Sequence, residues 1–134
     1  MSLNLAEERS IELGSELLAR GIGIEAGVFD LGDTCSRPPW AGQVTRVLVE
    51  VLFEHDDASA VELGTAIDAR VASLGRPRLW HGDGRATWAV VDAGLADGHD
   101  ARVGLEDTLI DRDGTPAPSN PDQVKRILAG SNGQ

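Results

Sequence analysis

The sequence predicts an α/β fold in which parallel strands carry helices on their outer side, as in half of a (β/α)8 (TIM) barrel. Short apolar segments alternate with amphipathic helical segments along the 134 residues, and parallel strands require such helical crossovers. Nearly every strand segment has one apolar face and one face with a charged group. A sheet covered by helices on both faces would bury those charges at high cost. A complete barrel takes roughly 250 residues, so this chain supplies about half of one.

Five segments have the composition and length of strands. The clearest is VTRVLVEVLF (44–53), which is β-branched and apolar. The other four are residues 2–5, 22–29, 77–82 and 101–107. Cutting a barrel leaves two open sheet edges and an uncovered lumen face, and we expect 2–5 and 101–107 to be those edges.

Helical periodicity predicts the segments between the strands. The predicted helices cover residues 6–20, 58–74 and 85–96, and a last helix begins at Asn120–Pro121, a cap residue followed by proline at the first helical position. Ser59 and Glu62 have the spacing of a capping box. The residues after the last helix, GSNGQ (130–134), are predicted to form a flexible tail.

One crossover departs from this pattern. The segment GDTCSRPPWAG (32–42) stands where a helix is expected, but Pro38–Pro39 forbids a regular one. We therefore expect a loop with at most one helical turn. No linker divides the chain, so residues 1–134 are predicted to form one partial barrel domain of about four strand–helix units and a leading strand.

Composition excludes several classes of partner. The formal net charge is -10, which disfavours nucleic acid and anionic membrane surfaces because their phosphates would be repelled. Cys35 is the only cysteine, so neither a disulfide within the chain nor a CxxC motif is possible. The first residues have no basic start and no apolar run of a signal peptide. We expect a cytoplasmic protein that binds neither nucleic acid nor membranes.

The polar faces of the strands predict where a site lies. Glu25, Glu50, His81 and Glu106 lie on the polar face of four predicted strands, and Arg102 shares a face with Glu106. We place these groups late in their strands, so they are expected to converge at the carboxyl ends of neighbouring parallel strands. Active sites of α/β folds lie at that end of the sheet.

Structural interpretations of the same residues remain open. Arg102 and Glu106 can form an ion pair that only stabilises the lumen. His81 can be a core histidine or a substrate contact, and we give the two equal weight. Glu25 and Glu50 fit lumen partners better than catalysts. The glycine-rich segment HGDGRATW (81–88) precedes a helix and can either cradle an anion or form a tight turn.

Five stretches together resemble one enzyme family. They are NLAE (4–7), ARGIGIEAGVFD (19–30), TRVLVEVLF (45–53), PRLWHGDGRATW (77–88) and GHDARVGLEDTLIDRDGTPAPSN (98–120). They resemble the carboxyl-terminal half of the β-keto acid cleavage enzymes, typified by 3-keto-5-aminohexanoate cleavage enzyme. The resemblance is most specific at Arg-Val-Gly-Leu-Glu-Asp (102–107), which is similar to the family's final-strand signature.

The resemblance implies a (β/α)8 barrel with a divalent metal, usually Zn²⁺, and a retro-Claisen exchange. In that reaction a β-keto acid and acetyl-CoA give acetoacetate and a new CoA thioester. By resemblance, Glu106 is a metal ligand, Asp107 the general base and Arg102 a group that stabilises negative charge. A metal polarises the keto oxygen, a carboxylate moves a proton and an arginine stabilises developing negative charge.

The chain departs from the family pattern at the metal. The family's other ligands are a His-x-His pair from an early strand, whereas this chain has only His55, His81 and His99. A catalytic zinc typically has three protein ligands. The chain is therefore either a fragment of a longer enzyme or a natural half. Two further interpretations are a non-catalytic half-barrel that self-associates or binds a partner, and another metal-dependent carbon–carbon lyase. Under each interpretation we expect a homo-oligomer that hides the open edges.

Overall fold

The fold is a parallel sheet whose strands follow one another in chain order. The computed structural model describes residues 1–32, 38–53 and 56–131. Each strand pairs in parallel with the next one along the chain. The strands are β1 (Ser2–Asn4), β2 (Glu25–Val28), β3 (Arg46–Val51), β4 (Arg78–Gly82) and β5 (Asp100–Ala101). Because the order never reverses, the sheet has no switch point of a doubly wound fold. The predicted α/β half-barrel is confirmed.

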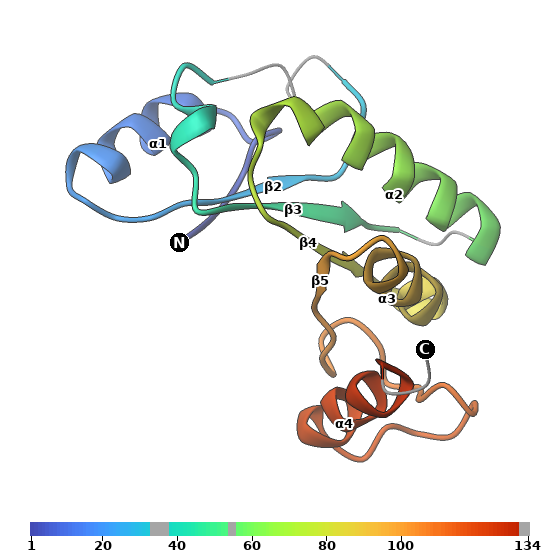
Figure 1. Cartoon of the computed structure of the whole chain (residues 1–134). Helices are drawn as coiled ribbons and strands as arrows, with labels where there is room; N and C mark the ends of the chain where they lie inside the picture. Colours follow the sequence, from blue (N-terminus) through green and yellow to red (C-terminus); the bar gives the residue numbers. More distant parts are fainter. Residues whose placement is uncertain (33–37, 54–55, 132–134) are drawn as a thin grey trace.

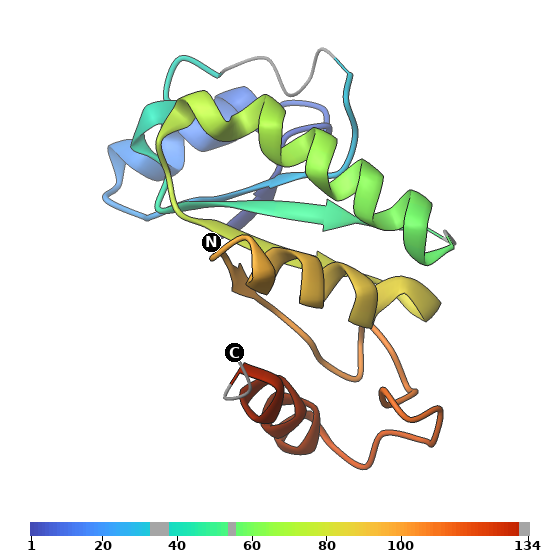
Figure 2. The ribbon, with the colours of Figure 1, turned by 45° about the vertical axis from the view of Figure 1, so that its right-hand side comes forward.

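Three of the four described α-helices lie along one side of this curved sheet. The four are α1 (Ser10–Ala19), α2 (Asp57–Val71), α3 (Thr87–Ala96) and α4 (Asn120–Ser131). Figures 1 and 2 show α1 and α2 above the sheet, α3 beside β4 and β5, and α4 apart from the sheet. The predicted edges are confirmed, because β1 and β5 end the five-stranded order. Among the described residues, no helix is long and apolar enough to cross a membrane.

Side-chain alternation divides β3 between the two faces of the sheet. Val47, Val49 and Val51 belong to the main apolar core, together with residues of all three neighbouring helices. Leu48 and Glu50 alternate with them and therefore point to the opposite, concave face. Leu48 is itself only 1% exposed. Leu48 is therefore buried within this chain, on the face that would line the lumen of a complete barrel.

Trp80 on β4 sets how closely two helices approach the sheet. Its side chain is fully buried. A Cβ added at Gly64 of α2 or at Gly94 of α3 would come within 2.7 Å of the Trp80 side chain. Real Cβ atoms essentially never approach other heavy atoms so closely. The two glycines therefore leave the space that the indole ring occupies.

The structure corrects the predicted start of the second long helix. Ser59 and Glu62 do not form a capping box, because α2 begins at Asp57 and Ser59 already lies inside its first turn. Asp56 is the N-cap instead, and its carboxylate accepts a hydrogen bond from the Ser59 backbone N–H at 3.0 Å. Asp56 has the extended backbone that a cap residue adopts.

The last predicted strand is much shorter than 101–107. Strand β5 ends at Ala101, and one further ladder bond joins the Arg102 N–H to the Trp80 carbonyl at 2.9 Å. The backbone N–H groups of Asp107 and Thr108 then donate to the Gly104 carbonyl, at 2.9 and 3.1 Å. These bonds close a turn, and a turn interrupts the strand alternation on which the prediction depended.

The proline-rich crossover (32–42) and the tail (130–134) agree in part with the predictions made from the sequence. The described part of the proline-rich crossover holds one short 3-10 helix, Ala41–Gln43, which agrees with the prediction of at most one helical turn. Cys35 and residues 33–37 lie outside the described residues, as does His55. Helix α4 continues through Ser131, so it overlaps the start of the predicted tail 130–134. Residues 132–134 of that tail lie outside the described residues.

We predict that Gly64→Ala or Gly94→Ala destabilises the protein by about 1–3 kcal/mol, although alanine ordinarily stabilises a helix, because the new methyl group overpacks Trp80. The measurement is urea unfolding at equilibrium. Gly42→Ala is the matched control, since nothing lies within 4 Å of a Cβ there. Unchanged or increased stability in both helix variants would contradict the packing argument.

Candidate functional site

The carboxyl ends of β3 and β4 bring Glu50 and His81 together. The two residues are register partners in the parallel pair, and both side chains lie on the concave face. His81 Nε2 is 3.2 Å from Glu50 Oε1. On the other side of Glu50, a Cβ at Gly27 of β2 would lie 3.0 Å from Glu50 Oε2. The glycine therefore leaves room for the Glu50 carboxylate between β2 and β4.

The turn after β5 adds Asp107 and Arg102 to this row. Asp107 Oδ1 lies 3.6 Å from His81 Nδ1, an ion-pair distance, and only 4% of the Asp107 side chain is exposed. Arg102 Nη2 donates to Asp107 Oδ1 at 3.0 Å and lies 2.9 Å from Glu106 Oε1. Glu50, His81, Asp107, Arg102 and Glu106 thus form one continuous row of alternating charge.

Helix α4 and the turn after β4 fix the backbone that carries Asp107. Asn120 Oδ1 accepts from the Leu105 N–H at 2.8 Å, and the buried Gln123 donates through Nε2 to the Thr108 carbonyl at 2.9 Å. From the other side, the Gly84 N–H donates to the Asp107 carbonyl at 2.7 Å. Gly84 has a φ of 62° and its N–H is used inside the chain. It therefore serves the tight turn rather than an anion cradle.

The row favours the ionised forms of His81, Asp107 and Arg102. Burial of the ring alone would lower the pKa of His81, but the neighbouring carboxylates of Asp107 and Glu50 outweigh burial and raise that pKa above 6.5. Burial alone would likewise raise the pKa of Asp107, yet His81 and Arg102 lower it below 3.8. The pKa of Arg102 is raised against burial by Asp107, its hydrogen-bond partner. Asp107 is therefore a carboxylate at neutral pH.

Several buried polar atoms of the row have no hydrogen-bond partner. Among the described residues they are His81 Nδ1, Asp107 Oδ2 and Arg102 Nε. Buried polar atoms are nearly always paired in folded proteins, so each exception needs a reason. Three such atoms on neighbouring groups are typical of a site whose ligand supplies the missing partners.

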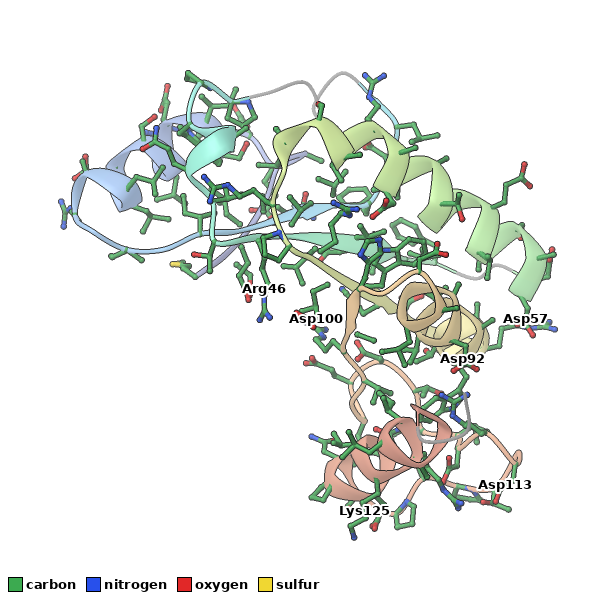
Figure 3. The ribbon with its side chains drawn as sticks, in the orientation of Figure 1. Arg46, Asp57, Asp92, Asp100, Asp113 and Lys125 are labelled. Carbon is green, nitrogen blue, oxygen red and sulfur yellow. The ribbon has the colours of Figure 1, made fainter. Side chains whose placement is uncertain are left out.

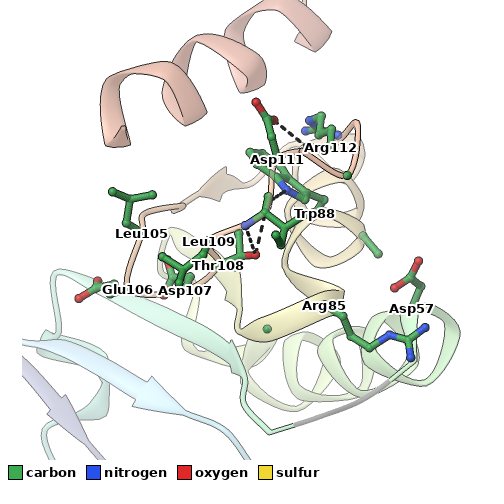
Figure 4. A pocket seen from close by; sticks show the side chains of 14 residues that line it. Asp57, Arg85, Trp88, Leu105, Glu106, Asp107, Thr108, Leu109, Asp111 and Arg112 are labelled. Atoms are coloured by element: carbon green, nitrogen blue, oxygen red, sulfur yellow. Dashed lines mark hydrogen bonds between the residues drawn. The ribbon is translucent and has the colours of Figure 1, made fainter. Parts of the chain in front are cut away.

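A cavity of about 740 Å³ opens beyond Asp107. Figure 4 shows Asp107 and Thr108 on one wall and Trp88 and Arg85 on another. Trp88 is held in place, because its indole N–H donates to the Ile110 carbonyl at 2.9 Å. Glu50 and His81 do not line this cavity, so it extends from the charged row and does not enclose it.

Comparison with known proteins decides the family. The family model described as beta-keto acid cleavage enzyme matches residues 6–131. The chain belongs to the beta-keto acid cleavage enzyme family. No curated protein matches the sequence. The match covers the whole sheet except β1, which ends at Asn4, and it includes every member of the charged row.

One predicted residue of the beta-keto acid cleavage site lies at the wrong end of the sheet. Glu25 is the first residue of β2 and pairs with Arg46, the first residue of β3. Figure 3 shows Arg46 far from Asp57, which begins α2 beyond the carboxyl end of β3. The expectation that Glu25 joins Glu50 and His81 is therefore wrong. The predicted strand 22–29 began too early, and this made Glu25 seem to lie late in it.

The structure exchanges the expected orientations of two adjacent carboxylates. Strand alternation predicted that Glu106 shares the polar face with Arg102. The side chain of Glu106 is instead 72% exposed and that of Asp107 is 4% exposed. The turn at 104–108 causes this exchange. Glu106 still contacts Arg102, but it is Asp107 that reaches His81.

A metal centre is not complete within the described residues. Residues 1–32, 38–53 and 56–131 contain no group of three or more His, Cys, Asp or Glu side chains able to hold an ion. Glu106 offers one carboxylate, which is exposed and beside Arg102. A catalytic zinc typically needs three protein ligands, so this part of the chain does not fit zinc by itself.

Sequence reasoning missed two contributors to the site. Gly27 was read only as part of a strand, and nothing in the sequence alone shows that Glu50 leans over it. The cavity residues Arg85 and Trp88 lie within HGDGRATW (81–88), which was singled out only for its glycines. The position of that segment directly after a strand was the available signal.

We predict that the stabilising effect of His81 depends on pH. Because its folded-state pKa is raised, its contribution is complete below pH 6.5 and is lost as pH rises through the folded-state pKa. The contribution of Asp107, whose pKa is lowered, is complete above pH 3.8 and is lost as pH falls through its own folded-state pKa. The free-energy difference between wild type and His81→Asn should therefore be largest between these limits and smaller at high pH. A difference that stays constant from mildly acidic to alkaline pH would contradict this.

Proposed function

We propose that this chain forms one wall of a β-keto acid cleavage site, in which a β-keto acid and acetyl-CoA give acetoacetate and a new CoA thioester. The observation that carries the proposal is the set of buried, unpartnered atoms on His81, Asp107 and Arg102. Family membership supports a small-molecule β-keto acid as the substrate. These three atoms can form hydrogen bonds or ion pairs with such a substrate, since two are nitrogens of basic side chains and one is a carboxylate oxygen.

Each group in the row has a distinct part in this chemistry. Arg102 is positively charged and 39% exposed, so it can bind the substrate carboxylate and stabilise charge on the departing enolate. Asp107 is ionised and its free Oδ2 accepts a proton from carbon or from a protonated intermediate. His81 lies between Glu50 and Asp107 and holds the Asp107 carboxylate in place.

The proposal assigns the other carboxylates supporting parts. Glu50 orients the His81 ring through the 3.2 Å contact and does not reach the reacting atoms. Glu25 stabilises the amino end of the sheet through Arg46 and Ser2 and has no part in catalysis. The cavity beyond Asp107 provides room for acetyl-CoA beside the proposed base.

Only one carboxylate of the described residues is proposed as a zinc ligand. Glu106 is the single ligand that this part of the chain offers, and its exposure leaves it open to ligands from elsewhere. The remaining ligands must come from outside the described residues. When bound, such a metal would polarise the keto oxygen.

We also propose that the two open edges of the sheet are covered by self-association. Strands β1 and β5 end the sheet, and unpaired edges tend to associate with other chains. A homo-oligomer in the cytoplasm fits the single cysteine and the acidic composition. The single-domain organisation remains a prediction.

A second candidate function is a non-catalytic half-barrel that assembles with itself or a partner. The incomplete metal ligand set of the described residues favours it. Under this alternative the charged row serves only to stabilise the concave face. The two candidates differ in turnover, because a binding module assembles without cleaving a β-keto acid.

We predict that Asp107→Asn lowers kcat of the acetyl-CoA exchange about 10²–10⁴-fold, since the amide cannot accept the proton. Arg102→Ala should lower kcat/KM about 10²–10³-fold by removing charge stabilisation. Acetoacetate formation from acetyl-CoA and a β-keto acid is the measurement. Asp97→Asn, an exposed change after α3, should leave activity intact. Full activity in Asp107→Asn would overturn the assignment of the base.

We predict that the purified protein is oligomeric. If it holds stoichiometric zinc, Glu106→Gln should lower its affinity for zinc at least tenfold. Metal analysis read together with solution mass is the measurement. Glu12→Gln, at an exposed helix position of α1, is the control. A stable monomer would contradict the edge argument, and zinc retained unchanged in Glu106→Gln would contradict the ligand assignment.

A further inference from the structure

The charged row ends at an aromatic pair on the side of β2 and β3. Val28 and Val49 are register partners. The residues that follow them are Phe29 and Glu50, so these two come at the same level of the sheet. The ring of Phe29 packs edge-on against the ring of Phe53, with centroids 6.3 Å apart and planes at 78°.

Phe53 combines two unfavourable features that the surrounding structure maintains. Its φ is 74°, a left-handed value that bulky residues rarely adopt. Its ring is also 68% exposed, although an aromatic ring gains stability from burial. Strained backbone of this kind clusters at ligand-binding positions. Phe53 follows the carboxyl end of β3, so this strained and exposed residue lies at the end of the sheet where the proposed site is.

The mouth of the concave face is therefore divided into two chemical halves. Arg102, Asp107 and His81 provide charge and unpartnered polar atoms on the side of β4 and β5. Phe29 and Phe53 provide an apolar surface on the side of β2 and β3. Glu50 lies between the halves, and its carboxylate faces His81.

We propose that Phe29 and Phe53 select β-keto acids whose side chain is apolar. This inference rests on the proposed function and names the substrate class of that same site. The keto acid head is bound by Arg102 and Asp107, and its hydrocarbon substituent extends across the row onto the two rings. An apolar substituent removes the exposed Phe53 surface from water, whereas an ammonium group would lose hydration there.

The test is direct binding by isothermal titration calorimetry, which does not depend on turnover. The probes are acetoacetate, 3-oxohexanoate and 3-oxo-5-aminohexanoate, each added to the whole chain as it is produced. We expect 3-oxohexanoate to bind about tenfold more tightly than acetoacetate, since it places two further methylene groups on the rings. The amino-substituted acid should bind no better than acetoacetate.

Two variants of Phe53 make the test specific. Phe53→Gly removes the ring and suits the φ of 74°, so it should abolish the preference without changing acetoacetate binding. Phe53→Leu keeps an apolar side chain and should retain most of the preference. Ile11→Ser, which removes an apolar side chain exposed on α1, is the control and should behave as wild type.

The outcomes separate this inference from the proposed function. If acetoacetate binds but 3-oxohexanoate shows no advantage, or if Phe53→Gly keeps the advantage, the inference is overturned and the proposed function stands. If the amino-substituted acid binds best, the inference is likewise overturned. If none of the three acids binds, both the inference and the proposed function fail.

Discussion

Side-chain alternation along β4 is the constraint on which the rest of the structure depends. Trp80 and His81 are neighbours in the chain and point to opposite faces of the sheet. Trp80 meets Gly64 and Gly94 on the helical side and fixes the distance of α2 and α3. His81 meets Glu50 and Asp107 on the concave side. One strand therefore couples the packing of the helices to the geometry of the site.

The charged row is a buried site that lowers the stability of the folded protein. Burial disfavours the ionised forms of His81, Asp107 and Arg102, and in each case an oppositely charged neighbour shifts the pKa back toward ionisation. The compensation is incomplete, since three buried atoms of these groups lack partners. Fully satisfied networks serve stability best, whereas a binding site keeps some of its polar atoms for a ligand.

The turn at 104–108 has the largest effect on chemistry. A strand that continued to residue 107 would have turned Asp107 away from the face that carries Arg102. The turn instead buries Asp107 against His81 and leaves Glu106 exposed. Helix α4 supports this turn through Asn120 and Gln123. A helix far from the sheet thereby supports the turn that decides which of two adjacent carboxylates is buried and which is exposed.

The sequence by itself determined the strand and helix order, the parallel sheet and the two edge strands. These features follow from local periodicity and from the requirement that parallel strands be joined by crossovers. It also predicted that Glu25, Glu50, His81 and Glu106 converge at the carboxyl ends of neighbouring strands, and the structure brings Glu50 and His81 together there. Only the tertiary structure decided that Glu25 lies at the opposite end, since this depends on the residue at which β2 begins.

Tertiary structure also decided that the Asp107 side chain turns toward His81 and that Gly27 makes room for Glu50. Neither has a local signal. Hydrogen bonds between segments distant in sequence close and support the turn, as Leu105 and Asn120 show. Periodicity reports which face a residue takes while a strand continues, but long-range contacts determine where the strand stops.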